Sequence, residues 1–297
     1  MNKVKGNKAY ESMYFVGFDG TYGGDVMLSG PIELLPSGLK VTGNLGIFLS
    51  EIKELPNDLK VGGKFSVVGN PHITSLPEGF EAKSLVISGS GITELPDVLV
   101  VGEFGFAKWQ IRSLPRISME VGNSLTLDGE HIEYLPEKMH IHGDLILKNL
   151  NVTKLPSDLF VKGNLTVENT PITELPPNFK VGGSISLEKT QVFKLPNDLT
   201  VDGDLNLRYC PITHLPYGLK VKQSLDVYGT QLTYVPDDLI VGYKLFMGNT
   251  PLSKDGTFVE PVGVNVRVRL GIRPGDDFDN GEWQQYEKRS DAGYMRS

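Results

Sequence analysis

Cysteine is almost absent from this sequence: the 297 residues include one, Cys210. No disulfide can therefore form within the chain, and the fold does not depend on an oxidising compartment. Apolar runs long enough to cross a bilayer, which takes about 20 residues, are also lacking. Residues 1–20 contain no apolar segment followed by a cleavage pattern. These absences predict a protein that stays in the cytoplasm, or is built into a particle there, and that makes no contact with a membrane.

A strong excess of either charge is missing as well. Lys and Arg total 29 and Asp and Glu total 36, so the net charge is −7. A nucleic-acid-binding protein needs a basic face that displaces the counterions of the phosphates. The mildly acidic composition predicts no nucleic-acid partner, and the charge is too small to indicate a DNA mimic.

The sequence also lacks the periodicity of amphipathic helices, and shows a different repeat. No segment shows an apolar stripe at a spacing of about 3.6 residues over three turns. Instead, Leu-Pro pairs recur from Leu35-Pro36 to Leu215-Pro216, and Val235-Pro236 is an eleventh copy. The successive intervals are 20, 21, 19, 19, 21, 20, 20, 20, 20 and 20 residues. A fixed period in this range is the sequence signature of a solenoid.

Each repeat has the pattern of one solenoid coil. Apolar or small residues alternate from Leu199 through Val201, Gly203 and Leu205 to Leu207. A period of two predicts an extended strand with one face inward, and the glycine predicts a bend within it. Proline has no N–H and a fixed φ, so the Leu-Pro step predicts a corner or an extended return. Eleven stacked coils, with parallel strands about 4.8 Å apart and few or no helices, would bury ladders of Leu, Val and Ile.

The segment LNLRYCPITHLP, residues 205–216, resembles the core of a leucine-rich repeat. The 20-residue length and the Leu-Pro step resemble the short bacterial class of these repeats, and the resemblance covers residues 25–254. The usual ladder asparagine is mostly replaced, for example by Thr170, Thr190 and Cys210. Because the alternation extends back to Val201, a parallel β-helix is the alternative fold. The style of the array also resembles uncharacterised bacteriophage proteins.

The ends of the chain depart from the repeat. We predict an N-terminal cap at residues 1–24, the solenoid at 25–254, a C-terminal capping strand at 255–273 and a polar tail at 274–297, since an array needs caps. An attachment arm that orders on a partner is the other interpretation of the C-terminal end. Its contact residues would be Arg267, Arg269, Trp283 and Tyr286.

No residue pattern indicates catalysis, a metal site or a cofactor. Cys210 occupies a ladder position, where a small buried residue is expected rather than a reactive thiolate. His140 and His142 share one face of a strand, but the equivalent residues one coil later, Phe160 and Lys162, are not metal ligands. Secreted leucine-rich-repeat effectors with ubiquitin-ligase activity carry a separate catalytic domain, for which the 43 residues after Lys254 are too few.

Aromatic residues become more frequent toward the C-terminal repeats. Tyr, Phe and Arg are enriched at interface hot spots. The repeat register brings several outward-facing side chains of successive strands together, and we predict a protein-binding patch there. Its residues are Arg208, Asp226, Tyr228, Tyr234 and Phe246.

These observations favour a non-catalytic protein-binding solenoid, encoded by a phage or a bacterium. One alternative is a structural or decoration component of a bacteriophage virion, docked to the capsid or tail by its termini. A more distant alternative is an effector that targets a host defence protein. The expected partner is therefore a protein, either a host factor or a shell or tail protein of a virion.

Overall fold

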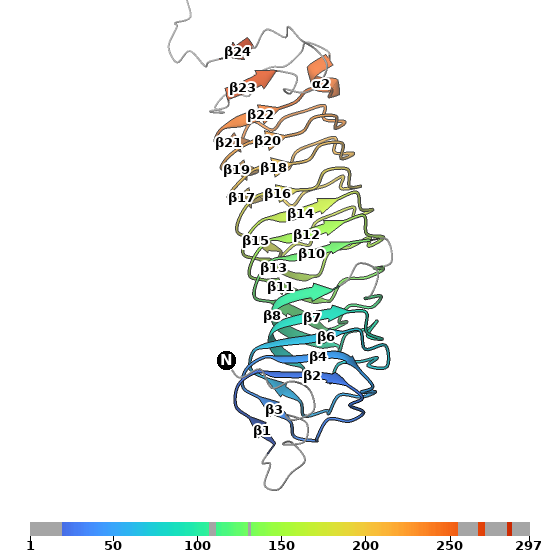
Figure 1. Ribbon diagram of the computed structural model, residues 1–297. Coiled ribbons are helices and arrows are strands. Elements are labelled where there is room, and N and C mark those ends of the chain that lie inside the picture. The colour runs from blue at the N-terminus through green and yellow to red at the C-terminus, as the bar shows by residue number, and fades with distance from the viewer. Residues whose placement is uncertain (1–19, 107–110, 130–131, 255–266, 271–283, 287–297) are drawn as a thin grey trace, which may run out of the picture. The chain divides into compact units, whose positions relative to one another are not determined.

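The repeats form a β-solenoid of about 11 coils in the computed structural model (Figure 1). The solenoid predicted from the 20-residue period is thereby confirmed. The structure describes residues 20–106, 111–129, 132–254, 267–270 and 284–286. The chain divides into two compact units, one of residues 1–162 and 178–180 and the other of residues 163–177 and 181–297.

Strands of the first unit pair in parallel. One sheet has the order β2, β4, β6, β7, β8, β9, β11, β13; β1, β3 and β5 form another, and β10 pairs with β12. The strands are β1 (Thr21–Tyr22), β2 (Val26–Gly30), β3 (Lys40–Val41), β4 (Leu45–Ser50), β5 (Lys60–Val61), β6 (Lys64–Val68), β7 (Glu81–Ser88), β8 (Val98–Phe106), β9 (Ser118–Val121), β10 (Leu125–Asp128), β11 (Lys138–Ile141), β12 (Leu145–Lys148) and β13 (Asp158–Val161).

The second unit repeats this plan with shorter strands. β14, β16, β18, β20, β22 and β23 pair in parallel, β24 pairs antiparallel with β23, and β17, β19 and β21 form a separate sheet. The elements are β14 (Leu165–Glu168), β16 (Ile185–Ser186), β17 (Thr200–Val201), β18 (Leu205–Asn206), β19 (Lys220–Val221), β20 (Leu225–Asp226), β21 (Ile240–Val241), β22 (Lys244–Phe246), the helix α2 (Pro251–Lys254), β23 (Arg267–Leu270) and β24 (Gln284–Tyr286). The strand β15 (Lys180–Val181) has its first residue in the first unit and its second residue in the second.

Apolar side chains at equivalent positions of successive coils stack into ladders that form the core of each unit. In the second unit Leu205 pairs with Ile185 on one side and with Leu225 on the other, and all three side chains are buried. The inward rows of the first unit are built in the same way, for example by Ile47, Val67 and Ile87. Stacking therefore buries the apolar face that a single coil leaves exposed.

The length of a repeat decides whether its strand is continuous. In the 20-residue coil that begins at Leu195, a bend at Asp202 and Gly203 separates β17 from β18. The coils that begin at Leu76 and Leu95 have 19 residues, and their strands β7 and β8 run without a break. The shorter interval leaves no residue for the bend.

After the strand, each coil turns at a corner. A ladder of small polar side chains inside this corner donates hydrogen bonds to backbone carbonyl groups. Thr190 Oγ1 donates a hydrogen bond to the carbonyl oxygen of Leu187 at 2.8 Å, and Thr230 Oγ1 donates to that of Val227 at 2.8 Å. Asn70 holds the equivalent place in the first unit. Its Nδ2 donates to the carbonyl oxygens of Ile47 and Val68, both at 2.8 Å. The sequence reasoning overlooked this asparagine, although the repeat register marks its position.

The corner that precedes this ladder has a left-handed backbone. Most coils place Gly or Asn there, residues that tolerate this conformation; examples are Gly69, Gly89, Asn149, Asn169, Gly229 and Asn249. Leu49, Lys189 and Tyr209 adopt it as well, with φ of 47°, 57° and 57°. A non-glycine residue pays about 1–2 kcal/mol for this conformation, so three coils carry a local cost.

We expect replacement of Lys189 by glycine to raise the free energy of unfolding by about 1 kcal/mol, because glycine removes this cost. The ion pair between Lys189 and Glu188, at 3.7 Å and partly exposed, offsets little of the gain. Lys194 lies outside the left-handed region, so its replacement by glycine should lower stability by about 0.5–1 kcal/mol. Urea denaturation of both variants measures the difference, and a Lys189→Gly variant no more stable than Lys194→Gly would contradict the interpretation.

Candidate protein-binding site

Outward-facing residues of β16, β18, β20 and β22 stand in one row in the second unit. The strand register pairs Ser186 with Asn206, Asn206 with Asp226, and Asp226 with Phe246. Parallel pairing in register thus places residues that are 20 apart in the sequence side by side. Arg208 and Tyr228 follow two residues after Asn206 and Asp226 in their coils.

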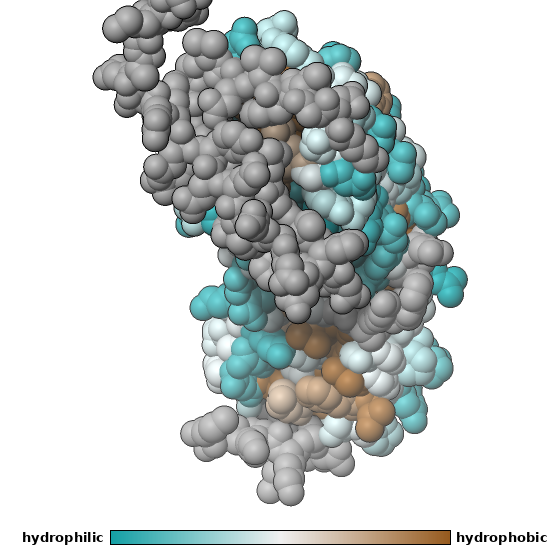
Figure 2. Space-filling model, turned by 90° about the horizontal axis from the view of Figure 1, so that it is seen from above, coloured by the Kyte–Doolittle hydropathy of each residue, from teal (hydrophilic) through white to brown (hydrophobic). Residues whose placement is uncertain are grey.

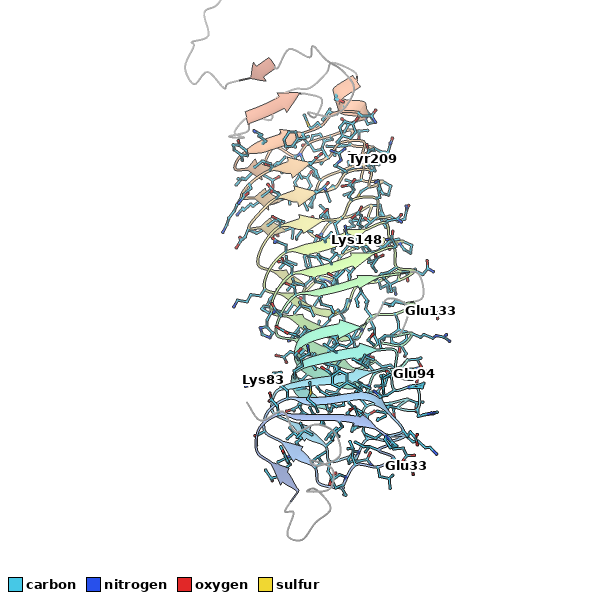
Figure 3. All side chains as sticks on the ribbon, in the orientation of Figure 1. Glu33, Lys83, Glu94, Glu133, Lys148 and Tyr209 are labelled. Carbon is cyan, nitrogen blue, oxygen red and sulfur yellow. The ribbon has the colours of Figure 1, made fainter. Side chains whose placement is uncertain are left out.

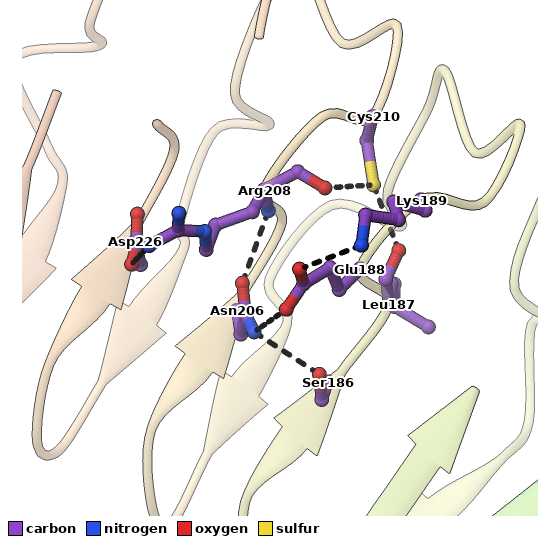
Figure 4. Close-up of polar contacts among 8 residues, drawn as sticks. All are labelled: Ser186, Leu187, Glu188, Lys189, Asn206, Arg208, Cys210 and Asp226. Carbon is purple, nitrogen blue, oxygen red and sulfur yellow. Dashed lines mark hydrogen bonds and ion pairs between the residues drawn. The ribbon is translucent and has the colours of Figure 1, made fainter. Parts of the chain in front are cut away.

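A buried ion pair lies at the centre of this surface. Arg208 Nη1 lies 3.6 Å from Asp226 Oδ2, and the two side chains are 9% and 10% exposed. Hydrogen bonds from backbone amides hold the surrounding side chains in place. The amide of Arg208 donates to Asn206 Oδ1 at 3.0 Å (Figure 4). The amide of Tyr228 donates to Asp226 Oδ1 at 3.0 Å.

Two tyrosine rings enclose the Arg208 guanidinium. Its Cζ atom lies 4.8 Å from the ring centroid of Tyr228 and 5.5 Å from that of Tyr209. The rings meet edge to face, with centroids 5.7 Å apart and planes at 83°. Each ring also lies across a glycine of the following coil, Tyr209 over Gly229 and Tyr228 over Gly248. Arg208, Tyr209, Asp226 and Tyr228 are called the tyrosine–arginine cluster below.

The charge of Arg208 is held firmly, although its hydrogen bonding is incomplete. Burial lowers the pKa of Arg208, but the hydroxyl of Tyr209 and the charges of Asp226 and Glu188 raise it by more, so it lies above its usual value. Within the described residues, Arg208 Nε and Nη1 are buried without a hydrogen-bond acceptor. A buried donor without an acceptor is costly. The cluster therefore holds a permanent positive charge just below its exposed aromatic surface.

A chain of polar contacts adjoins the cluster along the same face. Asn206 Nδ2 donates to Ser186 Oγ at 3.2 Å and to Glu188 Oε2 at 3.3 Å (Figure 4). Glu188 also pairs with Lys189. The border of the cluster is thus polar and partly charged. Within the cluster itself, Tyr209 is the most exposed residue.

Tyr209 is the residue of this site that sequence reasoning left out. Its side chain is 44% exposed and projects from the coils of the second unit (Figure 3). A signal was available, because Tyr209 stands at the corner position where the next two coils have Gly229 and Asn249. A bulky residue at a left-handed position is worth examining as a functional residue.

Tyr234, which was predicted to belong to the patch, lies in another row of the coil. It forms an isolated parallel bridge with His214 and is 45% exposed. Desolvation, together with the charge of Asp237 and the nearby Tyr217, raises the pKa of Tyr234. Its bridge partner, His214, stands directly before the Leu215-Pro216 step and does not belong to the tyrosine–arginine cluster.

The predicted attachment arm falls largely outside the described residues, as Trp283 does. Its described part contains β23 and β24. Lys244 of β22 pairs with Arg267, and Arg269 pairs with Gln285. β23 thus extends the sheet of the second unit by one strand, and Tyr286 of β24 pairs with Val268. Of the predicted cap at residues 1–24, the described part begins at Gly20.

The two strand histidines of the first unit pair with carboxylates. His140 Nε2 lies 3.2 Å from Asp158 Oδ1, and His142 Nε2 lies 3.0 Å from Glu120 Oε1. Phe160 packs edge-on against both imidazoles. In the described part of the chain, no three His, Cys, Asp or Glu side chains are arranged to hold a metal ion. Among the same residues, no helix is both long and apolar enough to cross a membrane.

Cys210 lies in the buried ladder of the second unit. Its Sγ is 2.9 Å from the carbonyl oxygen of Leu187 and 3.5 Å from Thr190 Oγ1. Burial raises the pKa of the Cys210 thiol. Because the thiolate is the reactive form, this position disfavours nucleophilic chemistry.

No protein-family model, curated protein or solved structure matches the chain.

We expect the Cys210 thiol to resist modification in the folded chain. An aromatic disulfide reagent at mildly alkaline pH should leave it intact, because the thiol is buried and its pKa is raised. The same reagent should react with it once urea unfolds the chain. Modification of the native protein at the rate of the unfolded one would show that Cys210 is accessible.

We expect the Arg208–Asp226 pair to be strongly coupled in stability. Asp226→Asn keeps the acceptor for the Tyr228 amide but leaves the buried Arg208 charge without its partner, and should lower the free energy of unfolding by about 3 kcal/mol. Adding Arg208→Met should recover most of this loss, because no buried charge remains. Equilibrium denaturation of the two single variants and the double variant measures the coupling. A double variant whose loss of stability equals the sum of the two single losses would contradict the coupling.

Proposed function

We propose that this chain is a non-catalytic protein-binding solenoid, encoded by a phage or a bacterium, that holds its partner on the tyrosine–arginine cluster. The observation that carries the proposal is Tyr209. This residue adopts a costly left-handed conformation where glycine or asparagine would fit, and it exposes a large ring there. Local strain of this kind is concentrated at binding sites.

Rigidity of the cluster supports the same proposal. Arg208 and the backbone at Gly229 and Gly248 hold the two rings, so little side-chain freedom is lost when a partner binds. Aromatic residues beside arginine are enriched among interface hot spots. The polar border formed by Asn206, Glu188 and Lys189 resembles the rim of a protein interface.

We further propose that the coils are leucine-rich repeats of the short bacterial type, not coils of a parallel β-helix. The buried polar ladder supports this, because Asn70, Thr190 and Thr230 bond the backbone at the position of the ladder asparagine in that family. Leucine-rich repeats commonly serve as protein-binding surfaces, which agrees with the proposed activity.

The test is capture of partners from the native source with tagged full-length chain. We expect recovery of one protein, followed by direct binding to that purified protein. Tyr209→Asn combined with Tyr228→Ala should weaken this binding by about tenfold or more, since it removes two anchors. Asparagine suits the left-handed corner, as Asn249 shows in the same unit. Tyr217→Ala, which removes an exposed tyrosine elsewhere in the unit, is the matched control and should bind normally.

Two results would overturn this proposal. Undiminished binding by the double variant would exclude the tyrosine–arginine cluster as the contact surface. Recovery of capsid or tail proteins that is lost when residues 274–297 are removed would favour the alternative, a virion component attached by its C-terminal arm.

A further inference from the structure

The first unit carries an apolar surface of a different kind, independent of the proposed function. On the outward side of β2, β4, β6 and β7 lie Met27, Phe48, Leu49, Val68 and Val86, here called the apolar face. The register makes the face continuous, because Phe48 pairs with Val68 and the row of Met27 leads through Gly46 and Ser66 to Val86. Figure 2 shows hydrophobic residues gathered on one part of the described surface, with hydrophilic residues beside them.

Glycines give this face a flat, closed surface. A side chain at Gly46 would collide with the ring of Phe48 and with Met27 Sδ, so these two side chains lie over the glycine. Leu49 lies over Gly69 in the same way. The apolar groups therefore form one layer above the sheet rather than separate protrusions.

Leu49 is the residue of the apolar face whose exposure and backbone conformation are hardest to explain by folding alone. Its side chain is 76% exposed, and its φ of 47° places a leucine at the corner where Gly69 and Asn149 stand in other coils of the unit. Folding alone favours neither the exposed leucine nor its left-handed backbone. Met27, at 51% exposure, extends the same surface to the neighbouring strand.

The charge pattern indicates what covers this face. Eight outward residues of β2, β4, β6 and β7 carry no charge; they are Met27, Ser29, Gly46, Phe48, Ser66, Val68, Val86 and Ser88. The charged outward residues Lys64 of β6 and Glu81 and Lys83 of β7 precede them in their strands, and Asp25 and Glu103 also stand at the border. In a twofold contact the residues near the symmetry axis meet their own copies, so a charge at the centre of the patch would face an identical charge. An uncharged apolar centre with a polar rim of both signs avoids this repulsion and matches the composition of homodimer interfaces.

We infer that the apolar face of the first unit binds the same face of a second copy of this chain, and that Leu49 and Met27 are its main contacts. The corresponding face of the second unit differs, because Glu168, Glu188 and Lys189 bring charge to it. Self-association is therefore assigned to the first unit and leaves the tyrosine–arginine cluster for another partner.

Sedimentation velocity of the full-length chain over the micromolar range tests this inference. We expect the wild type to form dimers. Leu49→Asn should raise the dimer dissociation constant by about tenfold or more while preserving the fold, since asparagine suits the left-handed corner. Met27→Lys should weaken the dimer similarly, because it buries an unpaired charge in an apolar contact. Lys189→Asn, the same corner change in the second unit, is the matched control and should leave the dimer unchanged.

Circular dichroism and thermal melting of each variant separate lost association from lost folding. A wild type that is monomeric throughout the concentration range would overturn the inference, because the face would then be uncovered or covered within its own chain. A dimer that persists with an unchanged dissociation constant in both Leu49→Asn and Met27→Lys would overturn it as well. These outcomes do not bear on partner binding at the tyrosine–arginine cluster, so the two proposals fail separately.

Discussion

In-register parallel pairing from one coil to the next is the constraint on which the rest of this structure depends. Each position meets its equivalent in the neighbouring coil, as Leu205 meets Ile185 and Leu225. A slip by one residue would turn every inward side chain outward. The register therefore demands the same kind of residue at the same place in coil after coil, which explains the near-identity of the repeats. It also permits a 19-residue repeat, provided that the residue lost is taken from the bend and not from the paired strand.

Most positions of the repeat have a preferred residue type, so a residue that departs from it indicates a local role other than stability. The left-handed corner accepts Gly and Asn at little cost, yet three coils place Leu49, Lys189 and Tyr209 there. Leu49 and Tyr209 are the two large hydrophobic side chains among them, and both are exposed, so neither contributes much to the core. Departures from local consistency are expected where function outweighs stability. The repeat thus serves as an internal reference against which such residues can be recognised.

Leu49 and Tyr209 lie in different chemical surroundings. Tyr209 adjoins the buried Arg208 of the ion pair, and Asn206 and Glu188 form a polar contact on the same face, so this surface combines aromatic contact with polar and charged groups. Leu49 lies in an uncharged layer with Phe48 and Met27 over glycines. A surface of the first kind suits a partner with complementary polar groups, whereas one of the second kind suits another apolar face. One fold can in this way present two surfaces with distinct partners.

The sequence by itself determined the period, the number of coils, the parallel stacking and the identity of the inward rows, because these follow from Leu-Pro spacing and from alternation. It also placed Asp226 and Phe246 next to each other, since a register of 20 residues follows from the repeat. Only the tertiary structure decided that Arg208 is buried between two tyrosines and that Tyr234 lies in a different row. It likewise revealed the left-handed corner and the way the rings rest on Gly229 and Gly248. The physical reason is that a pattern specifies which residues are neighbours, whereas backbone conformation and the rotamers of packed side chains decide which of them touch.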